Sequence, residues 1–292
     1  MSIYPIDRNH RPQVHDIGHL RLQPEETGTL PNGITLHVLN SGSAEVCRLG
    51  VAIPGGSAEN SSPRLFDIVA NLLPEGTVSM PGAMLAENLE SNGAWTQVSV
   101  HIHHTLLNLY CLNSRFDNLL PLVRDMVFQP AFLPEATERI LRTTASRIAV
   151  DRRRVEYLAS NALAPIVYGA DSPLAISPEP EEVLSVTPTR LHLAHKSRLD
   201  TGKMHIYLSG LVTESMVRSV GQVFGAIATD VSFETARLDF PVITGREQVF
   251  TKMPGALQNA VLAAIPTPGR LHRDFIAIRM PRRHWADISG RD

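Results

Sequence analysis

The chain has 292 residues, of which 43% are hydrophobic, and its 27 Lys and Arg against 29 Asp and Glu give a formal net charge of −2. This length allows one large domain or two of ordinary size, and the near-zero charge argues against nucleic acid as a main partner. Two cysteines, Cys47 and Cys111, cannot form a disulfide framework, and both lie in apolar, strand-like runs typical of a core. No apolar run reaches the roughly 20 residues that cross a membrane, and no secretion signal is evident, so we expect a soluble, cytoplasmic protein.

Hydrophobic periodicity and turn residues predict a mixed chain after a polar, Pro-rich N-terminal arm at residues 1–29. The helix at 62–76 has Ser62 as its expected N-cap, and a later long helix should break near Asp151 to Arg154. In chain order we expect strands at 34–38 and 46–53, helices at 62–76 and 84–93, a β-rich run at 96–112, helices at 114–128 and 134–166, a helix from 187, a strand at 203–210 and a helix at 213–225.

This order predicts an α+β fold, with helices on one side of a mostly antiparallel sheet, over residues 30–235. From about residue 236 the order of expected elements with which the first domain begins, two strands and then a helix, is repeated. Residues 249–253 and 259–265 are typical of strands and 274–280 of the start of a helix, so 236–280 is expected to begin a second domain of the same type.

The residues that carry a family resemblance are LPNGITLHVL, GGSAEN, LLPEGT, LESNGAWTQ and IYLSGLVTESM, in this order between Leu30 and Met280. Together they resemble the insulinase and pitrilysin (M16) family of zinc peptidases. The resemblance implies two homologous α+β domains that enclose a chamber for an unfolded peptide, often within a dimer of two such chains.

Active members of that family carry the sequence H-x-x-E-H, in which two His ligate zinc and the Glu is the general base. Alignment on Gly76-Thr77 places Asp67 and Asn71 at the two His positions and Ala70 at the Glu position. A third ligand, a Glu on a later helix, is expected near Ala145 to Arg147, a stretch with no carboxylate. The resemblance therefore implies a chain without a zinc cofactor or peptidase activity, and Asp67 is expected to pair with Arg64 on a solvated helix face.

The family guides its substrate along an edge strand that usually carries Asn-Ala after a Gly. The matching stretch follows Gly93 and makes four residues the candidates for peptide binding: Trp95, Thr96, Gln97 and Val98. Gln97 stands in for Asn, which departs from the family pattern.

A cluster of histidines offers an alternative metal site, because His101 and His103 would share one face of a strand beside His104. No third ligand of suitable type is evident, so a polar strand face is the simpler interpretation.

The final residues 281–292 continue neither the preceding apolar pattern nor the family pattern. Residues 282–292 can be encoded so that an adjacent frame reads L-G-G-Y-F-G-S-R, close to the motif expected there. We therefore expect an out-of-frame tail and a second domain cut short, with a natural divergent tail as the alternative.

Three functions remain open. The first is a non-catalytic subunit that pairs with an H-x-x-E-H-bearing zinc peptidase, or with a second copy of itself, around an unfolded peptide. The second is a stand-alone peptide-binding or scaffolding protein, and the third is a zinc endopeptidase with displaced ligands such as the histidine cluster. The sequence predicts neither a nucleic-acid nor a membrane partner.

Overall fold

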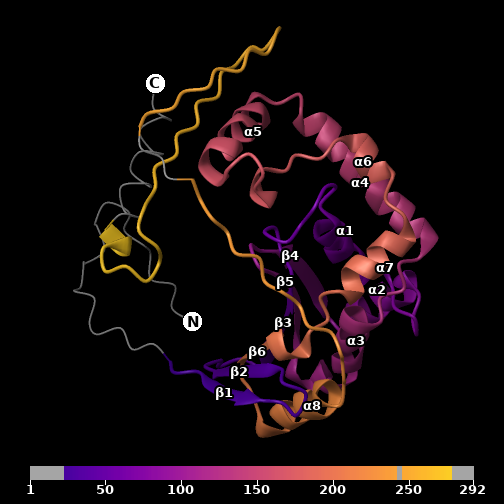
Figure 1. Ribbon diagram of the computed structural model, residues 1–292. Coiled ribbons are helices and arrows are strands. Elements are labelled where there is room, and N and C mark those ends of the chain that lie inside the picture. The colour runs from indigo at the N-terminus through magenta and orange to yellow at the C-terminus, as the bar shows by residue number, and fades with distance from the viewer. Residues whose placement is uncertain (1–22, 242–244, 278–292) are drawn as a thin grey trace, which may run out of the picture.

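The computed structural model describes residues 23–241 and 245–277 of the chain (Figure 1). Most of the expected N-terminal arm and the whole predicted out-of-frame tail at 281–292 lie outside the described residues. No helix among the described residues is long and apolar enough to span a membrane.

A six-stranded sheet forms the centre of the fold, in the order β1-β2-β6-β3-β5-β4. The strands are β1 (Glu26–Thr29), β2 (Thr35–Asn40), β3 (Val46–Pro54), β4 (Trp95–Val100), β5 (His104–Leu112) and β6 (His205–Gly210). Neighbouring strands are antiparallel except β2 and β6, which run parallel. The predicted α+β class with a mostly antiparallel sheet is confirmed.

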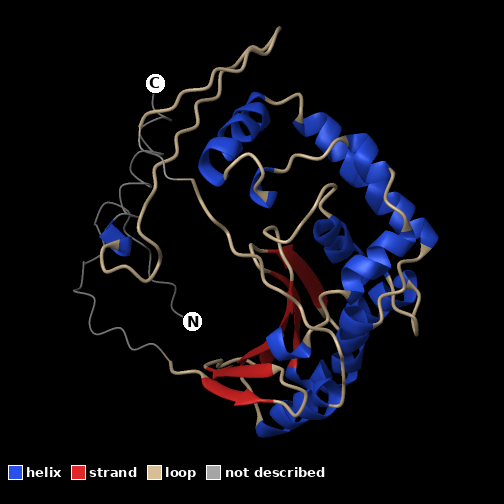
Figure 2. Cartoon of the chain, viewed as in Figure 1, coloured by secondary structure: helices blue, strands red, loops and turns tan. Residues whose placement is uncertain are grey.

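The helices gather on one side of this sheet, as Figure 2 shows. They are α1 (Leu65–Leu72), α2 (Gly82–Ser91), α3 (Phe116–Phe128), α4 (Pro134–Asp151), α5 (Val155–Tyr168), α6 (Pro180–Leu184), α7 (Pro188–Lys196) and α8 (Glu214–Gly225). The core lies between the layers, where fully buried Leu49 and Leu107 of the sheet join Phe116 and Val123 of α3 and Phe224 of α8 in one hydrophobic cluster. This layered burial holds α1 against the sheet and so positions the candidate site.

The start of α1 differs from the expectation that Ser62 caps it. The helix begins at Leu65 after Arg64, whose φ of 66° lies in the left-handed region. Ser62 Oγ instead donates a hydrogen bond to Glu182 Oε1 of α6, 3.0 Å away. The prediction failed because a partner 120 residues away in the sequence takes the hydroxyl.

The edge strand β1 lies inside the segment expected to be an irregular arm. All four of its residues are exposed, so its sequence ETGT carries no alternation of apolar and polar residues. It forms by pairing with β2, where Glu26 lies opposite Val38. An edge strand exposed on both faces gives no periodic signal for sequence analysis to detect.

The strands expected at 249–253 and 259–265 do not form in this structure, since residues 245–277 contain no strand. Their apolar side chains are open to solvent, with Phe250 90% and Val261 92% exposed. Strand pairs without further sheet neighbours bury too little apolar surface to be stable alone. The assignment of 236–280 to a second domain stays a prediction.

Candidate functional site

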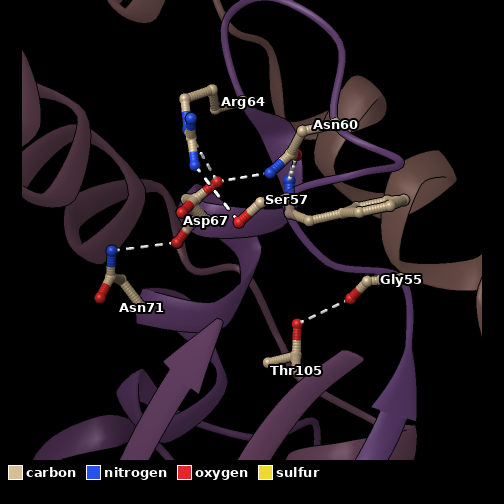
Figure 3. Close-up of polar contacts among 8 residues, drawn as sticks. Gly55, Ser57, Asn60, Arg64, Asp67, Asn71 and Thr105 are labelled. Atoms are coloured by element: carbon tan, nitrogen blue, oxygen red, sulfur yellow. Dashed lines mark hydrogen bonds and ion pairs between the residues drawn. The ribbon is translucent and has the colours of Figure 1, made fainter. Parts of the chain in front are cut away.

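Helix α1 carries the three residues that the sequence comparison aligns with the family's zinc ligands and general base, Asp67, Ala70 and Asn71. Asp67 and Asn71 are four residues apart and therefore share one face of the helix, whereas Ala70 is buried at 2% exposure. Asp67 Oδ2 accepts hydrogen bonds from Asn60 Nδ2 at 2.5 Å and from Arg64 Nε at 3.2 Å (Figure 3). The predicted ion pair between Arg64 and Asp67 is confirmed, and Asn60 adds a second partner that sequence analysis did not identify.

The loop before α1 fixes this arrangement. Asn60 Oδ1 accepts a hydrogen bond from the backbone N–H of Phe66 at 2.8 Å, so Asn60 joins the loop to the first turn of the helix. Glu59 accepts a hydrogen bond from the backbone N–H of Gly56 at 2.9 Å and lies 2.8 Å from Nδ1 of His103. The loop thereby fixes Asn60, so that the Asp67 carboxylate accepts from the neutral amide of Asn60 and from the cationic side chain of Arg64.

A pocket of about 490 Å³ opens beside this face of α1. Its walls come from α1, α4, α5 and the loop after α5, and include Arg64, Asp67, Asn71, Thr144, Arg147, Ile148, Asp151, Tyr157, Ser160, Asn161 and Tyr168. Thr144 and Arg147 of α4 therefore face the cavity shared by Asp67 and Asn71, in the stretch where the resemblance expects the third ligand. Arg147 makes no ion pair with any residue that the structure describes.

The donor set around this pocket suits hydrogen bonding better than zinc. Zinc takes thiolate, imidazole or carboxylate ligands, usually three or four. Here Asp67 supplies a carboxylate already bound by two donors, and the carboxylate of Asp151 pairs with Arg154. Asn71 supplies an amide, and Ala70 supplies neither a ligand nor a base. Within residues 23–241 and 245–277, no group of three or more His, Cys, Asp and Glu is arranged to hold a metal.

Strand β4 forms one edge of the sheet, and its four peptide-binding candidates lie along it. Trp95 is 60% exposed and stacks on Tyr110 of β5, with ring centroids 5.0 Å apart. Gln97 Oε1 accepts a hydrogen bond of 3.4 Å from the Tyr110 hydroxyl. Thr96 and Val98 alternate with these two residues along the strand, and both are half-buried. The strand packs against α1, so its open edge and the pocket belong to one region of the fold.

The histidine cluster does not lie as predicted. His101 and His103 are in the turn between β4 and β5 rather than on one face of a strand, and only His104 begins β5. His101 and His104 stack with ring centroids 4.6 Å apart, while His103 contacts Glu59. Burial lowers the pKa of His104, and the neighbouring His101 and His103 lower it further. Two of the rings stack on each other and the third turns to Glu59, so the three histidines do not converge on one point.

The family model described as Insulinase (Peptidase family M16) matches residues 37–171, which include α1, β4, α4 and α5. Just under half of this chain is therefore similar to the M16 family. The match spans Asp67, Ala70 and Asn71, the edge strand β4 and the parts of the pocket wall that come from α1, α4 and α5. No curated protein sequence matches the chain.

Solved structures share the fold of this chain at low sequence identity. The peptidase M16 inactive domain from Pseudomonas fluorescens is 19% identical with a TM-score of 0.67, over 75% of this chain and 54% of that one. A protease from Helicobacter pylori is 11% identical with a TM-score of 0.68, over 76% of this chain and 55% of the other. Pitrilysin is 18% identical with a TM-score of 0.64, and 76% of this chain covers 24% of pitrilysin. This chain thus spans about half the length of the first two structures and about a quarter of pitrilysin.

Proposed function

We propose that this chain is a non-catalytic subunit, which pairs with an H-x-x-E-H-bearing zinc peptidase and contributes a wall of the peptide-binding chamber. The observation that carries the proposal is that α1 is packed in the fold but carries none of the side chains that the zinc chemistry of the family needs. The helix keeps its packing against the sheet, yet Asp67, Ala70 and Asn71 replace both ligands and the general base. Without a base or a metal-bound water, the chain has no means to hydrolyse a peptide bond at this position.

The open edge of β4 supports a role in peptide binding. An extended peptide adds to an exposed sheet edge through main-chain hydrogen bonds, and neighbouring pockets select its side chains. Trp95 offers an exposed aromatic surface along that edge, and the pocket beside Asp67 offers donors and acceptors. In the proposal the four β4 residues hold the peptide while the partner supplies zinc and base.

A stand-alone peptide-binding protein is the second candidate. The specific observation in its favour is that the edge strand and the pocket both belong to this one chain and need no partner residue to form. Both candidates place the chain in the cytoplasm, where two thiols as close as Cys47 and Cys111 are kept reduced.

The decisive experiment combines metal analysis with a cleavage assay on the purified full chain. We expect less than about one tenth of a zinc per chain and no cleavage of a fluorescently quenched, unstructured peptide, with or without added zinc. Stoichiometric zinc with chelator-sensitive cleavage by the isolated chain would contradict both candidates.

Co-expression separates the two candidates. With an H-x-x-E-H-bearing M16 chain from the same organism, the subunit proposal expects a stable complex in size-exclusion chromatography and cleavage that requires both chains. A matched control changes the Glu of the partner's motif to Gln, which should abolish cleavage and leave the complex intact. Peptide binding by the isolated chain without complex formation would favour the stand-alone candidate.

A further inference from the structure

The two cysteines of the chain face each other across the centre of the sheet. The ladder between β3 and β5 pairs Cys47 directly with Cys111, and their Sγ atoms lie 3.6 Å apart as free thiols. Directly opposed residues of antiparallel strands have Cα atoms about 4.5–5.5 Å apart, and disulfides join Cα atoms about 4.4–6.8 Å apart. The backbone is therefore already at the spacing that a disulfide requires, and only the sulfur atoms have to approach.

We propose that Cys47 and Cys111 form an oxidisable dithiol, which a hydroperoxide converts into an intramolecular disulfide joining β3 to β5. Nothing in this inference depends on peptide binding or on a partner subunit. The Cys47–Cys111 pair is in this proposal a site of oxidative modification by a small, uncharged peroxide.

A second pocket of about 340 Å³ is lined by both cysteines together with Arg48, Trp95 and Tyr110. Successive residues of a strand point to opposite faces of the sheet, so the side chains of Arg48 and Tyr110 lie on the pocket face while the thiols of Cys47 and Cys111 point into the hydrophobic core behind it. Each thiol is only 4–5% exposed, which excludes bulky reagents. Hydrogen peroxide is uncharged and close to water in size, so it is the kind of oxidant that can reach a pair buried this deeply. The burial of both thiols therefore favours direct reaction with a small oxidant over thiol–disulfide exchange with another protein.

The two sulfur atoms are also chemically unequal. A hydrogen bond from the Cys47 thiol stabilises the thiolate of Cys111 and lowers the pKa of Cys111, although burial opposes this. The same hydrogen bond, followed by burial, raises the pKa of Cys47. Since the thiolate is the nucleophile, Cys111 is the residue that attacks the peroxide.

The reaction balances in two steps. The Cys111 thiolate attacks one peroxide oxygen, the O–O bond breaks, and the departing hydroxide takes up a proton to leave water and a sulfenic acid. Cys47 sulfur then attacks the sulfenic sulfur, the S–O bond breaks, and a second water carries away the Cys47 proton. Two thiols are oxidised to one disulfide while one hydrogen peroxide is reduced to two waters.

The test treats the folded, reduced full chain with stoichiometric hydrogen peroxide and measures free thiols and intact mass. We expect both thiols to disappear together, a mass lower by two hydrogen atoms, and a proteolytic fragment that joins the peptides containing Cys47 and Cys111. A dithiol reductant should restore both thiols. Because the chain has no other cysteine, the assay has no background from other sites.

Single variants supply the matched control. Cys47→Ser should trap the sulfenic acid on Cys111, detectable with a dimedone adduct, and Cys111→Ser should leave Cys47 at least about tenfold slower to react. In the wild-type chain the disulfide closes a loop of more than sixty residues and should raise the thermal unfolding midpoint by roughly 5–10 °C. Two free thiols after peroxide treatment, independent sulfinic acids, or disulfides only between chains would overturn the proposal.

Discussion

Asn71 Nδ2 donates a hydrogen bond to the backbone carbonyl oxygen of Asp67, 3.0 Å away (Figure 3). The side chain at the second zinc-ligand position is thus turned back onto its own helix. Asp67, at the first position, is held by Asn60 and Arg64. The Asp67 carboxylate and the Asn71 amide nitrogen thus both have partners within the protein, and these contacts help to fix the first turns of α1.

The network around Asp67 should contribute to stability. Asp67→Ala removes the partner of Asn60, which is 3% exposed, and leaves its amide unsatisfied, so we expect a loss of about 1–3 kcal/mol in the free energy of unfolding. Urea denaturation measures this loss. Asn71→Ala is the matched control, because Asn71 is exposed and its removal should cost less than about 0.5 kcal/mol. Equal losses in the two variants would show that Asp67 has no special structural role.

The pocket geometry predicts which residue completes a zinc site. Asp67→His with Asn71→His provides two imidazoles at i and i+4, and adding Arg147→Glu provides a carboxylate from α4 across the pocket. We expect the three-residue variant to bind zinc at least about 100-fold more tightly than the two-residue variant, measured by competition with a chromogenic chelator.

The control for this design uses the other face of α4. Arg142 is paired with Glu138 and its side chain is 72% exposed, so Arg142→Glu should add nothing to zinc affinity. Thermal unfolding of every variant establishes that each is folded. Equal zinc affinity for the Arg147→Glu and Arg142→Glu combinations would mean that Arg147 does not face the ligand positions.

The elements with strong periodicity were predictable from the sequence. Leu119, Val123 and Met126 follow the helical period and are all fully buried in α3. The break expected near Asp151 to Arg154 separates α4 from α5, and Thr213 caps α8 through a hydrogen bond from the backbone N–H of Met216. These features depend on residues a few positions apart, which sequence patterns report directly.

Features that depend on distant residues were not predictable. The parallel pairing of β2 with β6 brings Thr35 beside His205, and no local pattern encodes such a contact. In the site, the motif comparison identified positions 67, 70 and 71, but the contact from Asn60 follows from the path of a loop. The left-handed conformation of Arg64 is likewise set by that loop, since Arg has no intrinsic preference for it.

Trp95 should matter for peptide binding and little for folding. Its ring is 60% exposed, so Trp95→Ala removes aromatic contact surface along β4 while leaving the core intact. We expect the dissociation constant for an extended peptide to rise about 5- to 20-fold, measured by fluorescence anisotropy of a labelled peptide. Leu193→Ala on α7 is the matched control, because Leu193 is 64% exposed and lies away from β4. An unchanged affinity in Trp95→Ala would exclude β4 as the peptide-binding strand.

His195 of α7 should make the fold sensitive to acid. Burial, and then the positive charge of Arg198, lower the pKa of His195 to about 3, whereas the unfolded chain has the ordinary value of 6.5. Below about pH 6.5 His195 therefore binds a proton in the unfolded state but not in the folded state. The free energy of unfolding falls as the pH drops from about 6.5 to about 3. At about pH 4.5 this one residue should cost about 2 kcal/mol relative to neutral pH.

The variant His195→Gln isolates that contribution. It removes the titrating group from a position that is 4% exposed, so the variant should lose about 2 kcal/mol less than the wild-type chain between about pH 7 and pH 4.5 in urea denaturation. The pKa values of His104 and His205 are also lowered by burial, so both forms should keep part of the acid sensitivity. His192→Gln is the control, since His192 is exposed on the same helix and contributes least to the lowered pKa of His195, so most of the pH dependence of the wild-type chain should remain. If His195→Gln and His192→Gln show the same pH dependence, His195 is protonated in the folded chain and its burial does not exclude the charge.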